Sequence, residues 1–204
     1  MNERSFTSSP IMDKRERIFQ ATEELLAEKG FHGLSMSMVA KHANVATGTI
    51  YRYFTDKNDL LRQLYIHVNA QALEALYVGH DPQQAPFDQY RRFWLNAYRL
   101  ITDDADCLRC KSQYEASPHY EEIERDPQIQ AMWQPLYDFF EQGRQQGLLT
   151  NLPSRVLCTL SLDSVIHIAQ LTRLTGEPLD APQIDSVILA SWRAVLQPTT
   201  PSQE

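Results

Sequence analysis

The hydrophobic positions of this chain recur every three or four residues, which is the spacing of amphipathic helices. The first such pattern runs over 13–29, where Ile18, Leu25 and Leu26 share one face. Gly30 follows this pattern, and glycine is the residue type that most often ends a helix. We therefore expect one helix over 13–29.

Two short helices joined by a tight turn are predicted next. Ser35 is an N-cap residue type just ahead of an apolar pair. Asn44 is expected to adopt the left-handed conformation in the turn, because Asn tolerates it best among the residues other than glycine. A second helix is expected to begin near Thr47, with Ile50 and Phe54 one turn apart and facing inward.

The outward positions of this second helix are small, hydroxylic, cationic or phenolic. They are Thr47, Gly48, Thr49, Arg52 and Tyr53. A helix-turn-helix places such a helix in the major groove of DNA, with its N-terminal residues toward the base edges. The pattern therefore predicts a DNA-binding motif.

Helical periodicity continues to the C-terminal end, and alternating strand patterns are absent. Further helices are predicted over 56–78, 87–101, 104–116, 127–146, 153–172 and 182–196. The expected fold class is all-α, with about nine helices. We expect a disordered arm over 1–12, a three-helix head over 13–58 that carries the helix-turn-helix, and a larger helical body over 59–204.

The last two predicted helices, 153–172 and 182–196, are unusually apolar. The helix over 153–172 carries apolar residues on nearly all sides, and a helix of that kind is buried on both sides. Helix-turn-helix proteins usually bind DNA as two-fold dimers. We expect these two helices to form a homodimer interface, and a purely monomeric core is the alternative.

The run from Gly30 to Leu61 resembles the DNA-binding domain of the tetracycline-repressor (TetR) family. The matching elements are Gly-Phe, Val-Ala, Ala-Asn-Val, Gly-Thr-Ile-Tyr, a Phe and a Lys, in order and at the family's spacing. Asn44 stands where the family most often has Gly, and Ala46 where it often has Ser. Because Ala cannot cap a helix, we expect the cap to pass to Thr47. The resemblance also implies dimerisation through the two C-terminal helices, as a four-helix bundle.

The candidate DNA-binding residues are Ser35, Ser37, Thr47, Gly48, Thr49, Tyr51, Arg52, Tyr53 and Lys57. The resemblance implies that Thr47, Thr49 and Arg52 approach base edges. It implies that Tyr51, Tyr53 and Lys57 hold phosphates, and a Ser at a helix N-terminus can also donate to a phosphate. A core position is the alternative for Tyr51, and a solvated surface position is the alternative for Lys57.

The distribution of charge supports a DNA-facing head on an acidic body. The formal net charge is −7. Residues 1–58 hold eight Lys and Arg against seven Asp and Glu, whereas residues 59–204 hold 11 against 19. Lys14, Arg15 and Arg17 stand at the start of the first helix, the unfavourable end for cations, which nearby phosphates would explain.

Several classes of protein do not fit the sequence. No stretch is long and apolar enough to span a bilayer, and the N-terminus lacks a secretion signal, so we expect a cytoplasmic protein without membrane contact. Three cysteines fit a reducing compartment.

No enzyme motif, cofactor signature or metal-ligand set is present. Cys107 and Cys110 form a C-x-x-C, so sensing of oxidants or electrophiles is an alternative.

Aromatic and polar residues of the body suit a pocket for a small, hydrophobic or aromatic ligand. They are Trp94, Tyr98, Tyr114, Trp133, Tyr137, Phe140, Asp163, His167 and Gln170. Aromatic residues at helical spacing are also typical of an ordinary core. Asp163 and His167 lie four apart in the most apolar predicted helix, where a hydrogen-bonded pair and a ligand anchor are both possible.

We interpret the chain as a homodimeric transcriptional regulator. It would repress by binding a palindromic operator on double-stranded DNA, and a small molecule in the body would release it. One alternative is a DNA-binding protein of this fold without a small-molecule effector. The other is a helical-bundle enzyme that uses Asp163, His167 or the cysteines, with the head as a docking module.

Overall fold

The computed structural model describes residues 13–103, 113, 116–117 and 120–198, which form two compact units. We call the first unit the head; it contains the described residues of Met1–Tyr65 and Arg109–Tyr120. We call the second the body; it contains those of Ile66–Leu108 and Glu121–Glu204. The segment around Gln113 thus belongs to the head, although helices of the body flank it in the sequence.

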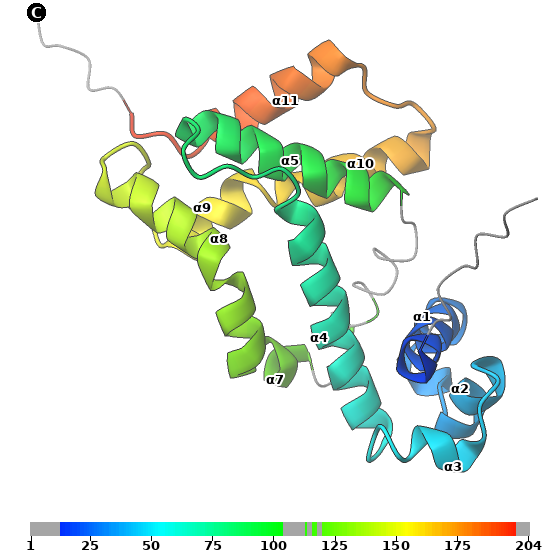
Figure 1. Ribbon diagram of the computed structural model, residues 1–204. Coiled ribbons are helices and arrows are strands. Elements are labelled where there is room, and N and C mark those ends of the chain that lie inside the picture. Colours follow the sequence, from blue (N-terminus) through cyan, green and yellow to red (C-terminus); the bar gives the residue numbers. More distant parts are fainter. Residues whose placement is uncertain (1–12, 104–112, 114–115, 118–119, 199–204) are drawn as a thin grey trace, which may run out of the picture. The chain divides into compact units, whose positions relative to one another are not determined.

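Helices account for nearly all regular structure in the described residues, so the predicted all-α class is confirmed (Figure 1). The head holds α1 (Lys14–Gly33), α2 (Met36–His42), α3 (Thr47–Ile50) and the start of α4 (Lys57–Leu76). The body holds the rest of α4, then α5 (Pro86–Asp103), most of α7 (Tyr120–Glu124), α8 (Pro127–Gln145), α9 (Ser154–Ser161), α10 (Ser164–Thr175) and α11 (Ala181–Arg193). One isolated antiparallel bridge joins Leu149 and Leu196.

Most predicted helices lie within about three residues of their expected bounds. The second helix of the helix-turn-helix is shorter than predicted, because α3 ends at Ile50 and Phe54 lies beyond it. The predicted helix over 104–116 lies almost wholly outside the described residues. The short helix α7 was not predicted. None of the helices in the described ranges has the length and hydropathy needed to span a membrane.

The turn of the helix-turn-helix forms as the sequence predicts. Ser35 caps α2, and its Oγ accepts a hydrogen bond from the Met38 N–H at 3.3 Å. Asn44 has a φ of 52° and is the one residue other than glycine with a positive φ in the described chain. Arg17 of α1 closes the turn, because its Nη2 donates to the carbonyls of Ala43 and Asn44, each at 2.7 Å.

The single helix predicted over 153–172 is wrong, because the chain breaks between α9 and α10 at Leu162 and Asp163. The Ser164 hydroxyl donates to the Ser161 carbonyl at 2.6 Å, and the Asp163 N–H reaches back five residues to Cys158 at 3.2 Å. Hydroxyl groups that bond to nearby carbonyls compete with the regular helical ladder. The apolar pattern of this stretch is uniform, so the helix break could not be predicted from it.

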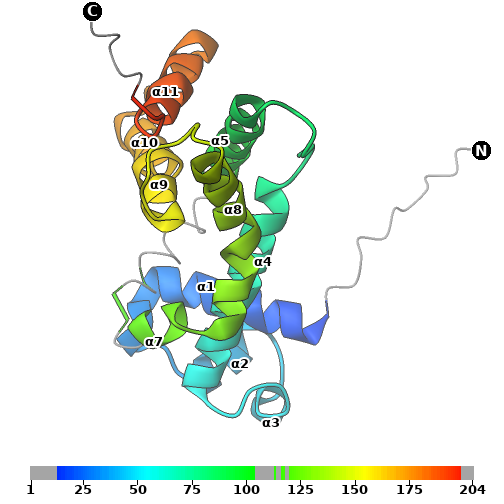
Figure 2. The ribbon, with the colours of Figure 1, turned by 90° about the vertical axis from the view of Figure 1, so that its left-hand side faces the viewer.

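The core of the body forms around α5, which lies against α10 and α11 (Figures 1 and 2). Tyr90, Phe93 and Trp94 of α5 are fully buried. Asn96 on the same helix is also buried, and its Nδ2 donates to the carbonyls of Leu76 and Val78, each at 2.8 Å. Leu76 is the last residue of α4 and Val78 follows two residues later, so Asn96 fixes the C-terminal end of α4 in the body.

The left-handed conformation at Asn44 gives a direct test of the turn. Asn44→Val should lower the free energy of unfolding by about 1–2 kcal/mol, because a β-branched residue is strained at positive φ. Asn44→Gly should unfold like the wild type, to within about 0.5 kcal/mol, because Gly adopts this conformation freely. Urea unfolding followed by circular dichroism measures both, and equal stability of the Val variant would contradict the turn geometry.

Candidate nucleic-acid interface

The recognition segment consists of the short helix α3 and the turn that follows it, residues 47–54. Ile50 and Phe54 are buried at 0% and 1% exposure, and the Phe54 N–H donates to the Ile50 carbonyl at 3.0 Å. These two side chains fix the segment to the core of the head. Each of the other positions in 47–54 is exposed, apart from half-buried Thr49.

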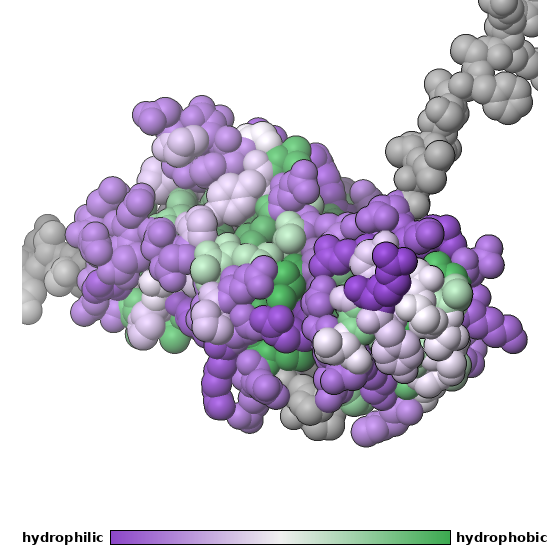
Figure 3. Space-filling model, turned by 60° about the horizontal axis from the view of Figure 1, so that its bottom comes forward, coloured by the Kyte–Doolittle hydropathy of each residue, from purple (hydrophilic) through white to green (hydrophobic). Residues whose placement is uncertain are grey.

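Both tyrosines of the recognition segment face solvent. Tyr51 is 54% exposed and Tyr53 is 38% exposed, so the core position considered for Tyr51 is wrong. Figure 3 brings forward the lower part of the view in Figure 1, where α3 lies, and shows pale, weakly polar atoms beside strongly hydrophilic ones. The exposed residues of the segment likewise combine weakly and strongly polar side chains; they are Thr47, Gly48, Tyr51, Arg52 and Tyr53.

The expected cap at Thr47 is wrong. Ala46 occupies the N-cap position of α3 and makes no side-chain cap, while Thr47 is the first helical residue. The Thr49 N–H donates to the Ala46 carbonyl at 2.7 Å, so the backbone begins the helix without help from a side chain. Thr47 is exposed at the N-terminal end of α3, the end that a groove-binding helix directs at base edges.

Two hydroxyl groups stand at the start of α2. The Ser35 Oγ lies 3.2 Å from the Ser37 Oγ and also caps the helix. Ser37 is exposed and Ser35 is half-buried. The pair combines hydroxyl donors with the N-terminal end of a helix, which is a favourable place for a phosphate oxygen.

Lys57 is a structural residue, and the solvated surface position considered for it is wrong. Its Nζ donates to the carbonyls of Phe31 at 3.0 Å and Leu34 at 3.3 Å, and lies 4.6 Å from the centre of the Phe31 ring. These contacts fix the first residue of α4 to the end of α1. An ammonium group has three N–H donors, so one remains for a phosphate.

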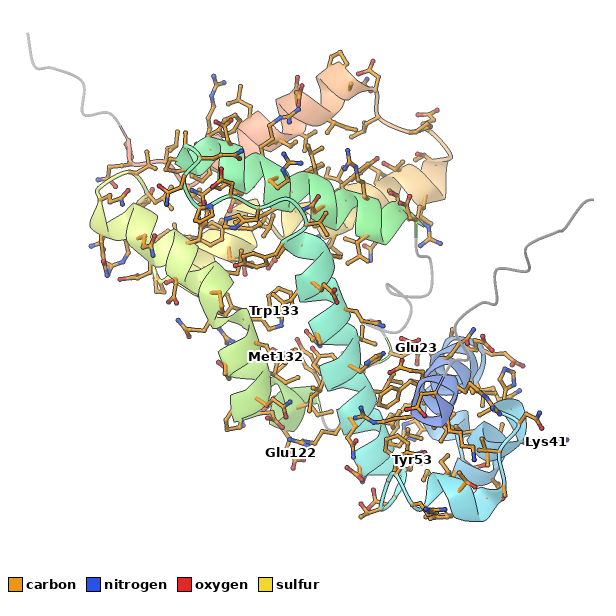
Figure 4. All side chains as sticks on the ribbon, in the orientation of Figure 1. Glu23, Lys41, Tyr53, Glu122, Met132 and Trp133 are labelled. Carbon is orange, nitrogen blue, oxygen red and sulfur yellow. The ribbon has the colours of Figure 1, made fainter. Side chains whose placement is uncertain are left out.

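Two of the three cations at the start of α1, Arg15 and Arg17, make contacts within the protein. Arg17 closes the turn at Asn44, and Arg15 donates to the Gln63 Oε1 at 3.1 Å with its guanidinium 4.8 Å from the Phe19 ring centre. Lys41 of α2, which the sequence reasoning missed, is exposed and points away from the head (Figure 4). The position of Lys41 beside the predicted turn could have identified it as a candidate DNA-binding residue.

The ligand-site candidates of the body differ in burial. Trp94 and Phe140 are fully buried, His167 is exposed, Tyr114 lies outside the described residues, and the others are half-buried: Tyr98, Trp133, Tyr137, Asp163 and Gln170. Trp94 and Tyr98 stack, with ring centres 5.3 Å apart. Trp133 reaches from α8 toward α4 and donates to the Asn69 Oδ1 at 2.9 Å (Figure 4).

Asp163 and His167 do not form the buried pair that their spacing indicated. Asp163 lies at the break before α10, half-buried, and its Oδ1 is 3.9 Å from the Cys158 Sγ. His167 lies inside α10 on its exposed side. The four-residue spacing would place them on one face only if the helix were continuous through Asp163.

Burial controls the ionisation of the other groups near this break. It raises the pKa of the Tyr90 hydroxyl to about 12 and raises the pKa of Tyr137, whose ring lies 5.0 Å from the Arg155 guanidinium. Burial, together with Asp163, also raises the pKa of the Cys158 thiol, so this cysteine remains an unreactive thiol.

Cys107 and Cys110 lie outside the described residues. No metal-binding group of three His, Cys, Asp or Glu occurs in the described ranges.

A tight helix-turn-helix with an exposed polar recognition segment, followed by a helical body, defines a DNA-binding transcriptional regulator. Residues 18–64 match the family of bacterial regulatory proteins called the tetR family. Residues 86–196 match the domain described as tetracyclin repressor-like, C-terminal. The chain belongs to the TetR family of transcriptional regulators. The resemblance inferred from the motif is confirmed, and the family is one of DNA-binding regulators rather than enzymes.

Similar proteins align over nearly the whole chain. An HTH-type transcriptional regulator of Haemophilus influenzae is 35% identical, over 90% of this chain and 96% of that one. The solved structure of a TetR-family protein from Vibrio parahaemolyticus is 32% identical, with a TM-score of 0.80 over 90% of this chain and 99% of that one. The regulator FadR from Bacillus subtilis, solved in complex with stearoyl-CoA, is 19% identical with a TM-score of 0.68, over 87% of this chain and 95% of that one, and shows the fold alone.

The exposed guanidinium of Arg52 can test base recognition. If Arg52 reads a guanine through a bidentate fork, Arg52→Ala should cost about 1–3 kcal/mol of specific binding and relax the sequence preference. Arg52→Lys should keep more of the non-specific affinity but lose the preference, because an ammonium lacks the fork. Fluorescence anisotropy with specific and scrambled duplexes measures both variants, and an unchanged preference in both would remove Arg52 from the base-reading set.

Lys57 should contribute to DNA affinity without reading sequence. Lys57→Ala should weaken binding to all duplexes alike and reduce the salt slope of log K by about one, because one phosphate contact is lost. Lys29→Ala is the control, since Lys29 is exposed at the end of α1 and pairs with Glu28. A slope that is unchanged in a folded Lys57→Ala variant would leave Lys57 with its structural role only.

Proposed function

We propose that this regulator is a homodimeric repressor that binds a palindromic operator and is released by a small, hydrophobic or aromatic molecule. In this proposal residues 13–58 bind DNA, and residues 59–204 bind the effector and dimerise. The observation that carries the proposal is the recognition segment, whose polar side chains face solvent while Ile50 and Phe54 hold it in place.

The DNA-binding residues of the proposal are those predicted from the sequence: Ser35, Ser37, Thr47, Gly48, Thr49, Tyr51, Arg52, Tyr53 and Lys57. The exposure of most of them supports this set, as does the position of the two serines at a helix N-terminus; Ser35, Thr49 and Lys57 are half-buried. Lys41 adds an exposed positive charge on α2. The fixed contacts of Arg17 and Lys57 support a preorganised head, because they hold the turn and the start of α4 before DNA is bound.

Exposed apolar side chains on the C-terminal helices support dimerisation through residues 153–172 and 182–196. Val156 and Leu160 of α9, Leu171 of α10 and Leu189 of α11 are 36–57% exposed. Figure 2 shows these three helices together on one side of the body. Adjacent exposed apolar residues mark protein interaction sites, and a second copy of these helices would complete a four-helix bundle.

The proposed release acts through α4, the long helix that belongs to both units. Lys57 holds its first residue to the head and Asn96 holds its end in the body. An effector that moves the end of α4 would change the spacing of the two recognition segments in a dimer. A coupling of about 1–3 kcal/mol would change operator affinity roughly 5- to 150-fold. A molecule that binds the body and leaves operator affinity unchanged would contradict this coupling.

Selection from a pool of random duplexes tests the DNA-binding part of the proposal. The enriched sequences should be two-fold symmetric, with half-sites about 34 Å or a multiple of that distance apart along the duplex. Enrichment of a single asymmetric half-site, or no enrichment at low salt, would contradict a dimeric repressor.

Charged substitutions on α9 and α10 test the dimer. Leu160→Asp combined with Leu171→Asp should convert the dimer to a monomer in sedimentation velocity, because an interface cannot bury unpaired carboxylates. Operator affinity should fall about 100-fold or more, since two linked heads bind far more tightly than one. Val78→Asp is the control, because Val78 is 62% exposed two residues after the end of α4, outside the proposed interface. A double variant that remains dimeric would place the interface elsewhere.

A further inference from the structure

Trp94 of α5 carries a buried hydrogen-bond donor that the protein does not use. Its side chain is fully buried, and its Nε1 has no hydrogen-bond partner. Within the described ranges, every other buried side-chain nitrogen or oxygen has a hydrogen-bond partner. An indole N–H can only donate, so the missing partner must be an acceptor. Leaving such a group unpaired in a core is unfavourable and calls for a specific reason.

The neighbouring polar groups of the body are paired, so poor packing is not that reason. The Tyr90 hydroxyl lies 2.8 Å from the Ser191 Oγ, and Asn96 donates to two carbonyls. A second indole, Trp133, donates to Asn69 at 2.9 Å. The fold supplies an acceptor to each of these groups and leaves Trp94 without one.

Tyr98, one helical turn after Trp94, has a hydroxyl group that is only weakly hydrogen-bonded. Its ring stacks on Trp94 with an interplanar angle of 14°. Its hydroxyl lies 3.4 Å from the Thr172 Oγ1 of α10, beyond the usual O–H···O distance of about 2.7–2.8 Å. Because Tyr98 is half-buried, the stacked pair extends from the core toward the surface of the body.

We infer that Trp94 is the anchor of the effector site in the body, and that its indole N–H donates to a carbonyl oxygen of a flat aromatic ligand. Tyr98, which is half-buried and stacks on Trp94, provides an aromatic face for the ligand at the outer end of this pair. The acceptor is a neutral carbonyl rather than a carboxylate, because one N–H donor would not offset the desolvation of a buried charge. This inference rests on the proposed function and gives its ligand a chemical class and a contact atom.

Two probes of nearly equal shape test the acceptor. 2-Acetylnaphthalene carries a carbonyl, whereas 2-ethylnaphthalene does not. In a ¹H–¹⁵N spectrum of the full-length protein, the Trp94 indole proton, assigned by its loss in Trp94→Phe, should shift downfield with the ketone only. A free-protein signal already at a hydrogen-bonded position would show that a water occupies the donor and would overturn the inference.

Binding of the two probes by variants supplies the second readout. Wild-type protein should bind the ketone about tenfold more tightly than the hydrocarbon, because only the ketone satisfies the buried donor. Trp94→Phe should abolish this preference while keeping affinity for the hydrocarbon. Trp192→Phe, a matched change at another buried tryptophan, should retain the preference.

The outcomes separate this inference from the proposed function. No binding of either probe, or an equal preference in wild type and Trp94→Phe, would overturn the Trp94 site. Operator binding is measured on the same samples and should be the same for wild type and Trp94→Phe without a probe. Failure of the wild type to bind the operator in the absence of any probe would instead contradict the proposed repressor.

Discussion

The structure depends on the fixation of α4 at both of its ends by polar side chains that bond to backbone carbonyls. Lys57, the first residue of the helix, donates to Phe31 and Leu34 in the head, and Asn96 of α5 donates to Leu76 and Val78 in the body. Each bond is made within its own unit. The proposed release acts through this helix because it belongs to both units.

The head combines a rigid interior with a surface that is free to bind. Ile50 and Phe54 are buried, Asn44 closes the turn in a left-handed conformation, and Arg17 bonds to that turn. The exposed residues of the recognition segment therefore project from a backbone whose geometry is already determined. Preorganisation of this kind reduces the entropy lost on binding DNA. The acidic balance of residues 59–204 is unfavourable for contact with a polyanion, which agrees with duplex binding through the head.

The sequence predicted the parts of the fold that local chemistry determines. Caps, breakers and apolar spacing located the helix-turn-helix and the helix predicted over 56–78, and the resemblance of the motif residues identified the family. Three features were not predicted in this way: two depended on contacts between residues distant in the sequence, and the third was a helix break. Arg17 and Lys57 find carbonyls 23–27 residues away, so their structural roles cannot be inferred from helix position. The break at Asp163 was hidden in a uniformly apolar run, and the expected Asp163–His167 pair failed with it. The unpaired indole of Trp94 also became apparent only when its neighbours were placed.

Under the proposed function, two copies of the recognition segment bind one duplex together. Sedimentation velocity with a fluorescent duplex that carries the selected operator measures the mass of the complex directly. The account predicts a complex of two chains on one duplex, formed at least ten times more tightly than with a scrambled duplex of equal length. A complex with a single chain, or equal affinity for both duplexes, would contradict it.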